Sequence, residues 1–450
     1  MFFLFILGND STINAQEVIL NRTENDSLPP LDINQRYNAF VTKDELEEQL
    51  KSYAWKKGDF TFTPYGFIWV NTAFDTNRTV PGEFVLYSQS ADIDDDPGFS
   101  IDARMSRLGI FVDGPEISSI PGSKIRGVVE ADFEGTPNGT KNKGGVQLRK
   151  AFVELSNKEK QTKILIGQDW EIISLLYPQM LNYLPAGFAG NLGYRRAQIR
   201  FDKGMTFSNN FKTLSQIALV DNIVGDYTAT TGVSAKVSGA PLIEGRLALS
   251  FWEQARNGLP ITAAVSGHWG EQTFGFSPIA GTFANQRIQS KPIKTWSANF
   301  ELDVPLTKKW RIQGEYYFGE NLSSFTGGIN QGVDLFTQNA IRNQGGWINI
   351  HYDLSDKLGT NFGYGIDKPN KNDLIGTSLP SNGITSARLQ NSVFFTNFIY
   401  HWSSALMTGL EFDYWHTKYQ RADVSGAEPI FLPMKDGKTF RTEFVVQYSF

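Results

Sequence analysis

Hydrophobic and polar residues alternate along the C-terminal stretch 440–450. One side of this alternation carries Phe440, Thr442, Phe444, Val446, Tyr448 and Phe450, and the other carries Arg441, Glu443, Val445, Gln447 and Ser449. Because successive side chains of a β-strand point to opposite faces, the stretch predicts an amphipathic strand with an aromatic-rich face and a charged face.

The same alternation recurs from Phe60 onward in segments of about ten residues. Three such segments have apolar sides made of Ile125, Val129, Ala131 and Phe133, of Trp296, Ala298, Phe300, Leu302 and Val304, and of Leu406, Leu410, Phe412 and Tyr414. Their opposite sides carry Lys124, Arg126, Glu130, Asp132 and Glu134, then Ser297, Asn299, Glu301 and Asp303, then Glu411 and Asp413. The chain is therefore predicted to be all-β.

Two all-β architectures can use strands of this kind. A soluble sandwich buries the apolar faces between two sheets. A transmembrane barrel turns them toward lipid and encloses the polar faces in a wet lumen. Several charges per strand, and Trp and Tyr near strand ends, favour the antiparallel transmembrane β-barrel.

Connections between the segments alternate between short and long, as the two rims of an outer-membrane barrel require. The short ones include LSDK and WSSA, and the long ones cover residues 75–102, 170–192, 270–291, 319–343, 367–389 and 418–437. Counting opposite rims gives about 16 strands, an even number as expected for a bacterial single-chain barrel. The region 212–240 is ambiguous, and reading two further strands there gives about 18.

Composition narrows the class of protein further. The 450-residue chain has 13% aromatic residues, no cysteine and a net charge of −5. These values argue against a disordered chain, against thiol chemistry and against a strongly basic nucleic-acid binder. No stretch approaches the roughly 18 apolar residues of a membrane-spanning helix, whereas a barrel spreads its apolar residues over alternating positions.

The amino-terminal part divides into two predicted regions before the barrel. Residues 1–16 resemble a signal peptide that lacks its basic start, so the true start is expected to lie upstream. Residues 17–57 predict a periplasmic linker and a short helix at 42–54, where Thr42 and Glu45 have capping-box spacing. The barrel itself is expected to span 58–450.

Five short motifs, in order within residues 103–201, resemble a known family. They are MSRLGIFVDG, KIRGVVEADFEG, QLRKAFVEL, ILIGQDW and NLGYRRAQIRF. The chain resembles the DcaP-like trimeric porins of Gram-negative outer membranes. The resemblance implies a homotrimeric 16-stranded channel with a short coiled coil before the barrel and a preference for small anionic solutes such as dicarboxylates. The helix at 42–54 departs from the pattern because it covers fewer than two heptads. The phosphate-selective porins are the second family considered.

Arginines on neighbouring strands are the candidate selectivity residues: Arg107, Arg126, Arg149, Arg196 and Arg200. The alternation turns Arg126, Arg196 and Arg200 toward the lumen, and the match to the family motifs does the same for Arg107 and Arg149. Arg104 and Arg195 have the opposite parity and are expected near a rim or in a loop. A row of arginines in a narrow pore would attract and orient anions. The alternative is a balanced lumen, in which carboxylates such as Glu130 and Asp132 pair with the arginines.

The segment 170–190 is unusually apolar for a connection and contains Pro178 and Pro185. We expect it to fold into the lumen and narrow it, because so apolar a loop would be costly to leave in water. The alternative is an outer loop at a subunit contact.

Other candidate chemistry is weak. The acidic run Asp92, Asp94, Asp95 and Asp96 could hold calcium but lacks the EF-hand spacing, so a solvated acidic loop is favoured. His268, His351, His401 and His416 show no metal-ligand spacing. No hydrolase or nucleotide-binding motif is present, so neither an enzyme nor a cofactor is expected.

The predicted function is therefore passive diffusion of small hydrophilic, anionic solutes across a Gram-negative outer membrane, with outer-membrane lipid as the surrounding partner. A surface-binding barrel, with the long loops as its working parts, is the alternative of a different class.

Overall fold

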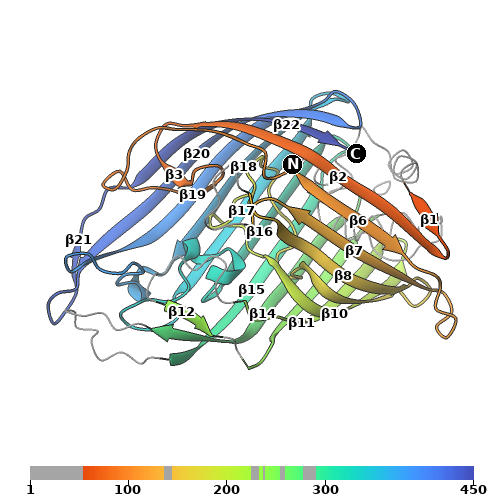
Figure 1. Cartoon of the computed structure of the whole chain (residues 1–450), viewed down its shortest axis with the longest axis horizontal. Coiled ribbons are helices and arrows are strands. Elements are labelled where there is room, and N and C mark those ends of the chain that lie inside the picture. Colours follow the sequence, from red (N-terminus) through yellow and green to blue (C-terminus); the bar gives the residue numbers. More distant parts are fainter. Residues whose placement is uncertain (1–53, 136–143, 224–232, 237–238, 254–258, 277–289) are drawn as a thin grey trace.

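The computed structural model describes residues 54–135, 144–223, 233–236, 239–253, 259–276 and 290–450. The expected signal peptide at 1–16 lies outside the described residues, as does the expected helix at 42–54 apart from its last position. The described residues form a barrel of long, tilted, antiparallel strands (Figure 1).

Seventeen strands build the wall, because β5 and β6 share one of its sixteen positions. They are β2 (Phe60–Asp75), β5 (Gly98–Asp102), β6 (Arg107–Asp113), β7 (Ser123–Asp132), β8 (Gln147–Asn157), β9 (Thr162–Trp170), β10 (Arg195–Ser208), β11 (Phe211–Val220), β13 (Leu242–Phe251), β14 (Ile261–Phe276), β15 (Ser290–Pro305), β16 (Trp310–Glu320), β17 (Arg342–Asp353), β18 (Leu358–Pro369), β19 (Ile384–His401), β20 (Leu406–Asp423) and β22 (Gly437–Ser449).

The remaining elements are short strands and 3-10 turns outside the sixteen wall positions. They are β1 (Trp55–Lys57), β3 (Thr79–Pro81), β4 (Val85–Ser88), β12 (Val233–Lys236), β21 (Ile430–Leu432) and the 3-10 turns η2 (Ser323–Phe325), η3 (Gly328–Asn330) and η4 (Lys371–Asp373). The strand β1 pairs with β2, so sheet structure begins just ahead of the expected boundary at residue 58. The 18-strand alternative is wrong: β11 pairs directly with β13, and β12 only extends the edge of β14.

The barrel closes where its first and last wall strands meet. β2 pairs with β22 over nine registered positions, from Phe67 opposite Ser449 to Asp75 opposite Arg441. Inside this seam, Arg441 Nη1 donates to Asp75 Oδ2 at 2.9 Å, and Arg441 Nε donates to Glu443 Oε2 at 2.9 Å. Strands at opposite ends of the chain thus complete one ring.

The predicted separation of faces is confirmed along β22. Phe444 and Tyr448 are 45% and 51% exposed on the outer surface, whereas Arg441 and Glu443 on the opposite face of the strand are fully buried. Comparable exposed apolar side chains occur around the barrel, including Ile199, Phe300 and Leu410. A closed barrel with an apolar exterior and an ionic interior is built for a lipid bilayer.

The two rims also agree with the prediction. Turns such as 306–309, 354–357 and 402–405 close one end, and long connections such as 76–97, 171–194 and 321–341 leave the other. Outer-membrane barrels have short periplasmic turns and longer extracellular loops, which assigns the long-connection rim to the outside.

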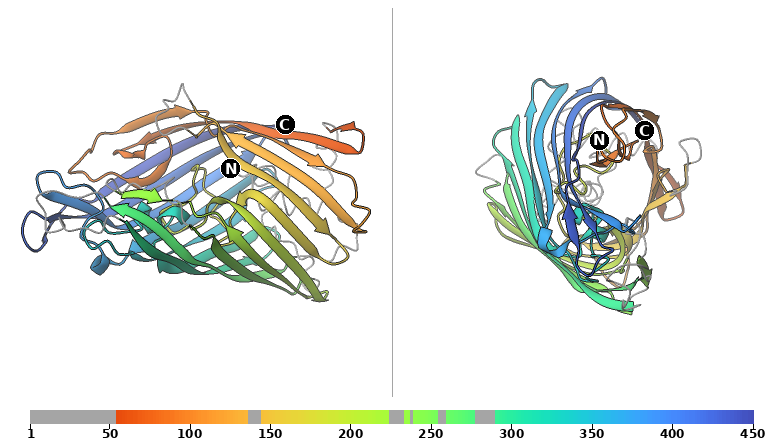
Figure 2. Two further views of the ribbon diagram at one scale, coloured as in Figure 1. Left: turned by 60° about the horizontal axis from the view of Figure 1, so that its bottom comes forward. Right: turned by 90° about the vertical axis from the view of Figure 1, so that its left-hand side faces the viewer.

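Three of the long connections lie inside the barrel, as the end-on view in Figure 2 shows. They are 76–97 with the β3–β4 hairpin, 171–194, and 321–341 with η2 and η3. One buried cluster includes Phe84, Leu184 and Ile329, one side chain from each connection. The apolar core of this protein therefore sits within the lumen, where loop side chains pack against inward-facing residues of the wall strands.

Candidate functional site

Arg149 on β8 is the centre of a charged network on the inner wall. A β-bulge in the β7–β8 pairing, where Glu130 faces Lys150 and Ala131 faces Leu148, makes Arg149 the extra residue. A bulge re-aims side chains, so Arg149 and Lys150 are both buried inside although they are adjacent in sequence. Arg149 Nε donates to Glu130 Oε1 at 2.9 Å and Arg149 Nη1 to Asp132 Oδ2 at 2.7 Å.

Arg107 and Arg126 flank this network on β6 and β7. The Nη1 of Arg107 lies 3.5 Å from Glu130 Oε1, and its guanidinium stacks 5.1 Å above the ring of Phe67. Arg126 Nε donates to Asp113 Oδ1 at 2.5 Å, with the guanidinium over the ring of Phe111. Both arginines face inward as expected, and both meet a carboxylate.

Arg196 and Arg200 lie on β10. Arg196 is fully buried; it pairs with Glu171, donates to the carbonyl oxygen of Ser324 at 2.5 Å, and stacks on Phe325 at 4.2 Å. It therefore ties two of the inward connections to the wall. Arg200 lies 3.4 Å from carboxylate oxygens of Asp169 and Asp202. All five candidate arginines thus contact carboxylates, which is the arrangement of the balanced lumen.

The two arginines of opposite parity lie where strands begin or break. Arg104 sits in the break between β5 and β6 and pairs with Asp102 at 2.6 Å. Arg195 is the first residue of β10, and its guanidinium lies 5.2 Å from the ring of Trp170 and 5.1 Å from that of Tyr194. Arg195 is nevertheless nearly fully buried and interacts electrostatically with Arg149 and Asp132.

The connection 171–194 crosses the lumen against the inner wall, as its apolar composition predicts. Its backbone N–H groups donate to side chains of five wall strands, β13, β14, β16, β17 and β20. The pairs are Ile172 with Glu244 Oε2 at 3.1 Å, Ser174 with Ser266 Oγ at 3.3 Å, Leu176 with Glu315 Oε1 at 2.7 Å, Gln179 with Asn349 Oδ1 at 3.3 Å, and Leu181 with Glu411 Oε1 and Oε2 at 2.9 and 2.8 Å. Buried N–H groups need such acceptors, and these five side chains supply them.

The same connection then returns to the arginine wall. Asn182 accepts from the N–H of Val85 and donates to its carbonyl, both at 2.9 Å, which joins the connection to β4. The hydroxyl of Tyr183 lies 2.8 Å from Asp132 Oδ2 and 2.9 Å from Gln147 Oε1. The connection thus bridges β20 and β7 across the interior.

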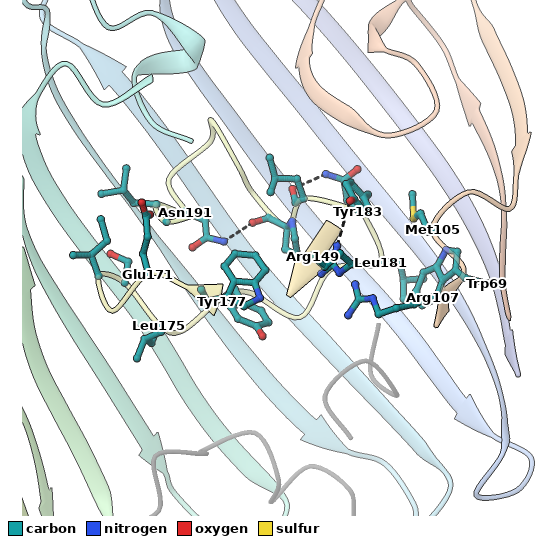
Figure 3. A pocket seen from close by; sticks show the side chains of 18 residues that line it. Trp69, Met105, Arg107, Arg149, Glu171, Leu175, Tyr177, Leu181, Tyr183 and Asn191 are labelled. Carbon is teal, nitrogen blue, oxygen red and sulfur yellow. Dashed lines mark hydrogen bonds between the residues drawn. The ribbon is translucent and has the colours of Figure 1, made fainter. Parts of the chain in front are cut away.

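A cavity of about 60 Å³ remains between this connection and the arginine wall. Figure 3 shows Arg107 and Arg149 on its wall side and Tyr177 and Tyr183 on its loop side. Glu171 lines it as well. Among the side chains that line it, Arg107 and Arg149 are cationic and Glu171 is acidic, which leaves one positive charge (two minus one).

Several residues of this site carried no prediction. Glu171 and Tyr183 belong to the inward connection, and nothing in their sequence neighbourhood names their partners. Glu244, Glu315 and Glu411 fall on the polar face of the alternation, so their inward direction was predictable but their role as acceptors for a loop was not.

The other candidate sites resolve into ordinary contacts. Asp92 Oδ2 accepts the N–H of Lys435 at 3.0 Å, and Asp94 pairs with Arg78 at 2.9 Å, so the acidic run ties loops together. Within the described residues, no group of three or more His, Asp or Glu side chains could hold a metal ion. His268 lies among Ser297, Thr295 and the ring of Phe325. No helix in the described part of the chain is long and apolar enough to cross a membrane.

Comparisons with solved structures agree with this architecture. The outer-membrane channel DcaP of Acinetobacter baumannii superposes with a TM-score of 0.65, at 16% identity, over 88% of this chain and 99% of that one. The chain has the fold of the outer-membrane porins.

Two further porins of known structure are similar in the same way. The anion-selective porin from Comamonas acidovorans gives a TM-score of 0.51 at 12% identity over 87% of this chain and 100% of that one. OprB of Pseudomonas putida gives 0.50 at 9% identity over 90% and 96%. No protein-family model and no curated protein sequence matches the chain. The porin fold and the apolar exterior identify an outer-membrane protein of a Gram-negative bacterium.

Proposed function

We propose that this porin-fold protein is a passive diffusion channel for small hydrophilic solutes, with a preference for anions such as dicarboxylates. The observation that supports diffusion is the closed barrel of sixteen positions whose interior is ionic while its exterior is apolar. Transport of this kind needs no covalent step, because the width of the pore and the charge of its wall select the solute.

The anion preference rests on the side chains around the cavity beneath the connection 171–194. Arg107 and Arg149 line it, and Arg195 lies next to them. Pairing with Glu130 and Asp132 cancels part of this charge, but the side chains that line the cavity carry one more positive than negative charge. Guanidinium groups keep their charge at any working pH and match the planar shape of a carboxylate. One of the structures with a similar fold is that of an anion-selective porin.

Planar-bilayer recordings test both parts of the proposal. Purified protein is expected to give discrete conductance steps, with a reversal potential in a salt gradient that shows anion preference. R107Q/R149Q removes two positive charges and is expected to shift the reversal potential toward cations. R149Q/D132N is the matched control, because it removes one charge of each sign and should leave the selectivity near that of the wild type.

The two parts fail separately. Folded protein without conductance steps contradicts the channel. Conductance with an unchanged reversal potential in R107Q/R149Q leaves the channel intact and contradicts the role of the arginines.

We also propose that the protein is a homotrimer, which rests on its resemblance to the DcaP-like porins. Chemical cross-linking in intact outer membranes is expected to give a species of three times the monomer mass. Cross-linking that stops at the monomer contradicts the assembly.

A further inference from the structure

A second groove lies on the outer surface of the barrel, at the rim of the long connections. Its volume is about 610 Å³. The side chains and backbone that line it come from β15 to β20 and the β18–β19 connection: Trp296, Phe318, Gly319, Arg342, Asn343, Gln344, Lys368, Pro369, Asn370, Lys371, Leu389, Gln390 and Lys418. It is separate from the lumen and takes no part in the channel proposed above.

The groove is strongly basic. Its lining includes Arg342, Lys368, Lys371 and Lys418 and no carboxylate. Asp373, beside the groove, holds the guanidinium of Arg342 through bonds of 2.8 and 2.7 Å. Within the described residues the three lysines have no ion-pair partner, and all three are exposed. An anionic ligand would supply the missing charge.

The position of these lysines relative to the apolar exterior indicates which kind of anion the groove would bind. Lys368 follows the exposed Tyr364 by four positions on β18, and Lys418 follows the exposed Tyr414 by four positions on β20. At a rise of about 3.3 Å per residue, each ammonium-bearing residue lies roughly 13 Å along its strand beyond a tyrosine of the apolar belt. Tyrosines of barrels sit at the membrane interface, so the lysines lie on the water side of the apolar belt, within reach of the lipid headgroups.

Strand register places polar donors in the same row as the lysines. Gln344 on β17 is directly opposite Lys368, and Gln390 on β19 is directly opposite Lys418. On the other side of Gln344 its register partner is Phe318, which is 38% exposed. The groove therefore combines ammonium and amide donors with an aromatic surface on its membrane side.

A neighbouring part of the same rim lacks this arrangement. On β14 and β15, Glu271 is the register partner of Lys294, and both side chains face outward. That pair offers one charge of each sign. The excess of positive charge is a property of the groove and does not extend along β14 and β15.

We propose that this groove binds the phosphate group of an outer-leaflet lipid, with Lys368, Lys371 and Lys418 as its ligands. The acyl chains of that lipid lie along the apolar exterior below, against Phe318, Tyr364 and Tyr414. Charge complementarity and the depth of the lysines favour a membrane lipid over a soluble partner, because the groove opens directly above a surface that faces hydrocarbon.

Binding measurements on the full-length, detergent-solubilised protein test this assignment. The probes are dioctanoyl phosphatidic acid, dioctanoyl phosphatidylcholine and inorganic phosphate. The test variant is K368Q/K371Q/K418Q. The matched control is K308Q/K309Q/K357Q, which removes the same charge from exposed lysines at the short-turn rim. Conductance and heat-modifiable migration in gels are recorded for every protein, and both are expected to stay unchanged.

The wild type is expected to bind phosphatidic acid more tightly than phosphatidylcholine. The test variant should lose affinity for phosphatidic acid on the order of 100-fold. Each basic residue near an anionic lipid surface strengthens binding by a comparable factor, and the variant lacks three of them. The control variant should bind like the wild type.

Three results would overturn the proposal. Equal affinity of the test variant and the wild type removes the lysines as ligands. Equal affinity of wild-type protein for inorganic phosphate and phosphatidic acid would mean a site for free phosphate. Dissociation of an oligomer in the test variant alone would identify the groove as a contact between copies of the chain.

Discussion

The backbone N–H of Leu181 donates to both carboxylate oxygens of Glu411, at 2.9 and 2.8 Å, although 230 positions separate the two residues in the chain. Glu411 also accepts from Asn397 Nδ2 at 2.8 Å. One side chain on β20 thus holds the middle of the connection 171–194 against the wall, across the lumen from β9, where the connection starts.

E411A should release this part of the connection. Alanine leaves the buried N–H of Leu181 without its acceptor, and a buried donor left unsatisfied costs about 1–3 kcal/mol. Hydrogen exchange at residues 179–183 is expected to accelerate, and single-channel current is expected to become noisier. E411Q is the control, because it keeps one carbonyl acceptor and should change both quantities less. Equal protection in wild type and E411A would contradict the anchoring role.

R149Q should destabilise the barrel. The Arg149 side chain is 4% exposed and contacts Glu130 and Asp132, so its removal leaves two buried carboxylates without their nearest cation. Breaking a buried ion pair from one side costs about 3–5 kcal/mol. The midpoint of urea unfolding in detergent is expected to fall, and it should recover in part in R149Q/E130Q/D132N. A triple variant less stable than R149Q would refute this explanation.

Substitutions on the outer face of β22 should depend on depth. Phe444 lies midway between Phe440 and Tyr448, all three being exposed apolar residues of the same strand. Arginine on the lipid face costs about 2–4 kcal/mol at the midplane and about 0–1 near the interfaces. F444R is therefore expected to lower the equilibrium stability in lipid vesicles more than F440R, with tryptophan fluorescence as the measure. Equal effects of the two changes would argue against the assigned membrane position.

The contact between Asp92 and Lys435 should persist over the physiological pH range. The N–H of Lys435, chiefly, holds the pKa of the Asp92 carboxyl below its ordinary value of 3.8. A lowered carboxyl pKa means that the stabilising contribution is fully present above the ordinary value and is lost as the pH falls through the lowered one. Protection of the Lys435 amide from exchange, corrected for intrinsic rates, should be constant from pH 5 to 8 in the wild type (roughly the range of maximal stability of folded proteins). D92N should reduce that protection at every pH, and an unchanged amide in D92N would contradict the contact.

Alternation along the chain was sufficient to predict the strands, because lipid outside and charge inside impose a period of two on every wall strand. The charges on the polar faces, the aromatic residues near strand ends and the connection lengths then favoured the barrel over a sandwich. It could not settle the region 212–240, where a four-residue strand at the edge of β14 has too few positions to show a period. The inward direction of Arg126 and Arg196 followed from parity alone.

The details of the site lay beyond such reasoning for physical reasons. Arg149 and Lys150 both face inward because of a bulge, and parity assigns adjacent residues to opposite faces. The wall side chains that accept from the backbone of the connection 171–194 lie between 72 and 230 positions from their donors, which no local pattern specifies. Likewise, the sequence offered arginines and carboxylates on the same strands, and only three-dimensional placement paired them.

The pairing of β2 with β22 has a consequence for how this molecule is made. The Arg441–Asp75 contact joins residues 366 positions apart, so nearly the whole polypeptide must be assembled before it can form. Folding slows as contacts become more distant in sequence. Until β2 and β22 pair, each has an edge of unpaired backbone N–H and C=O groups, which can form hydrogen bonds with strands of other chains. The slowest and most aggregation-prone moment in biogenesis should therefore be the joining of β2 to β22, and variants weakened there should accumulate as unclosed sheets.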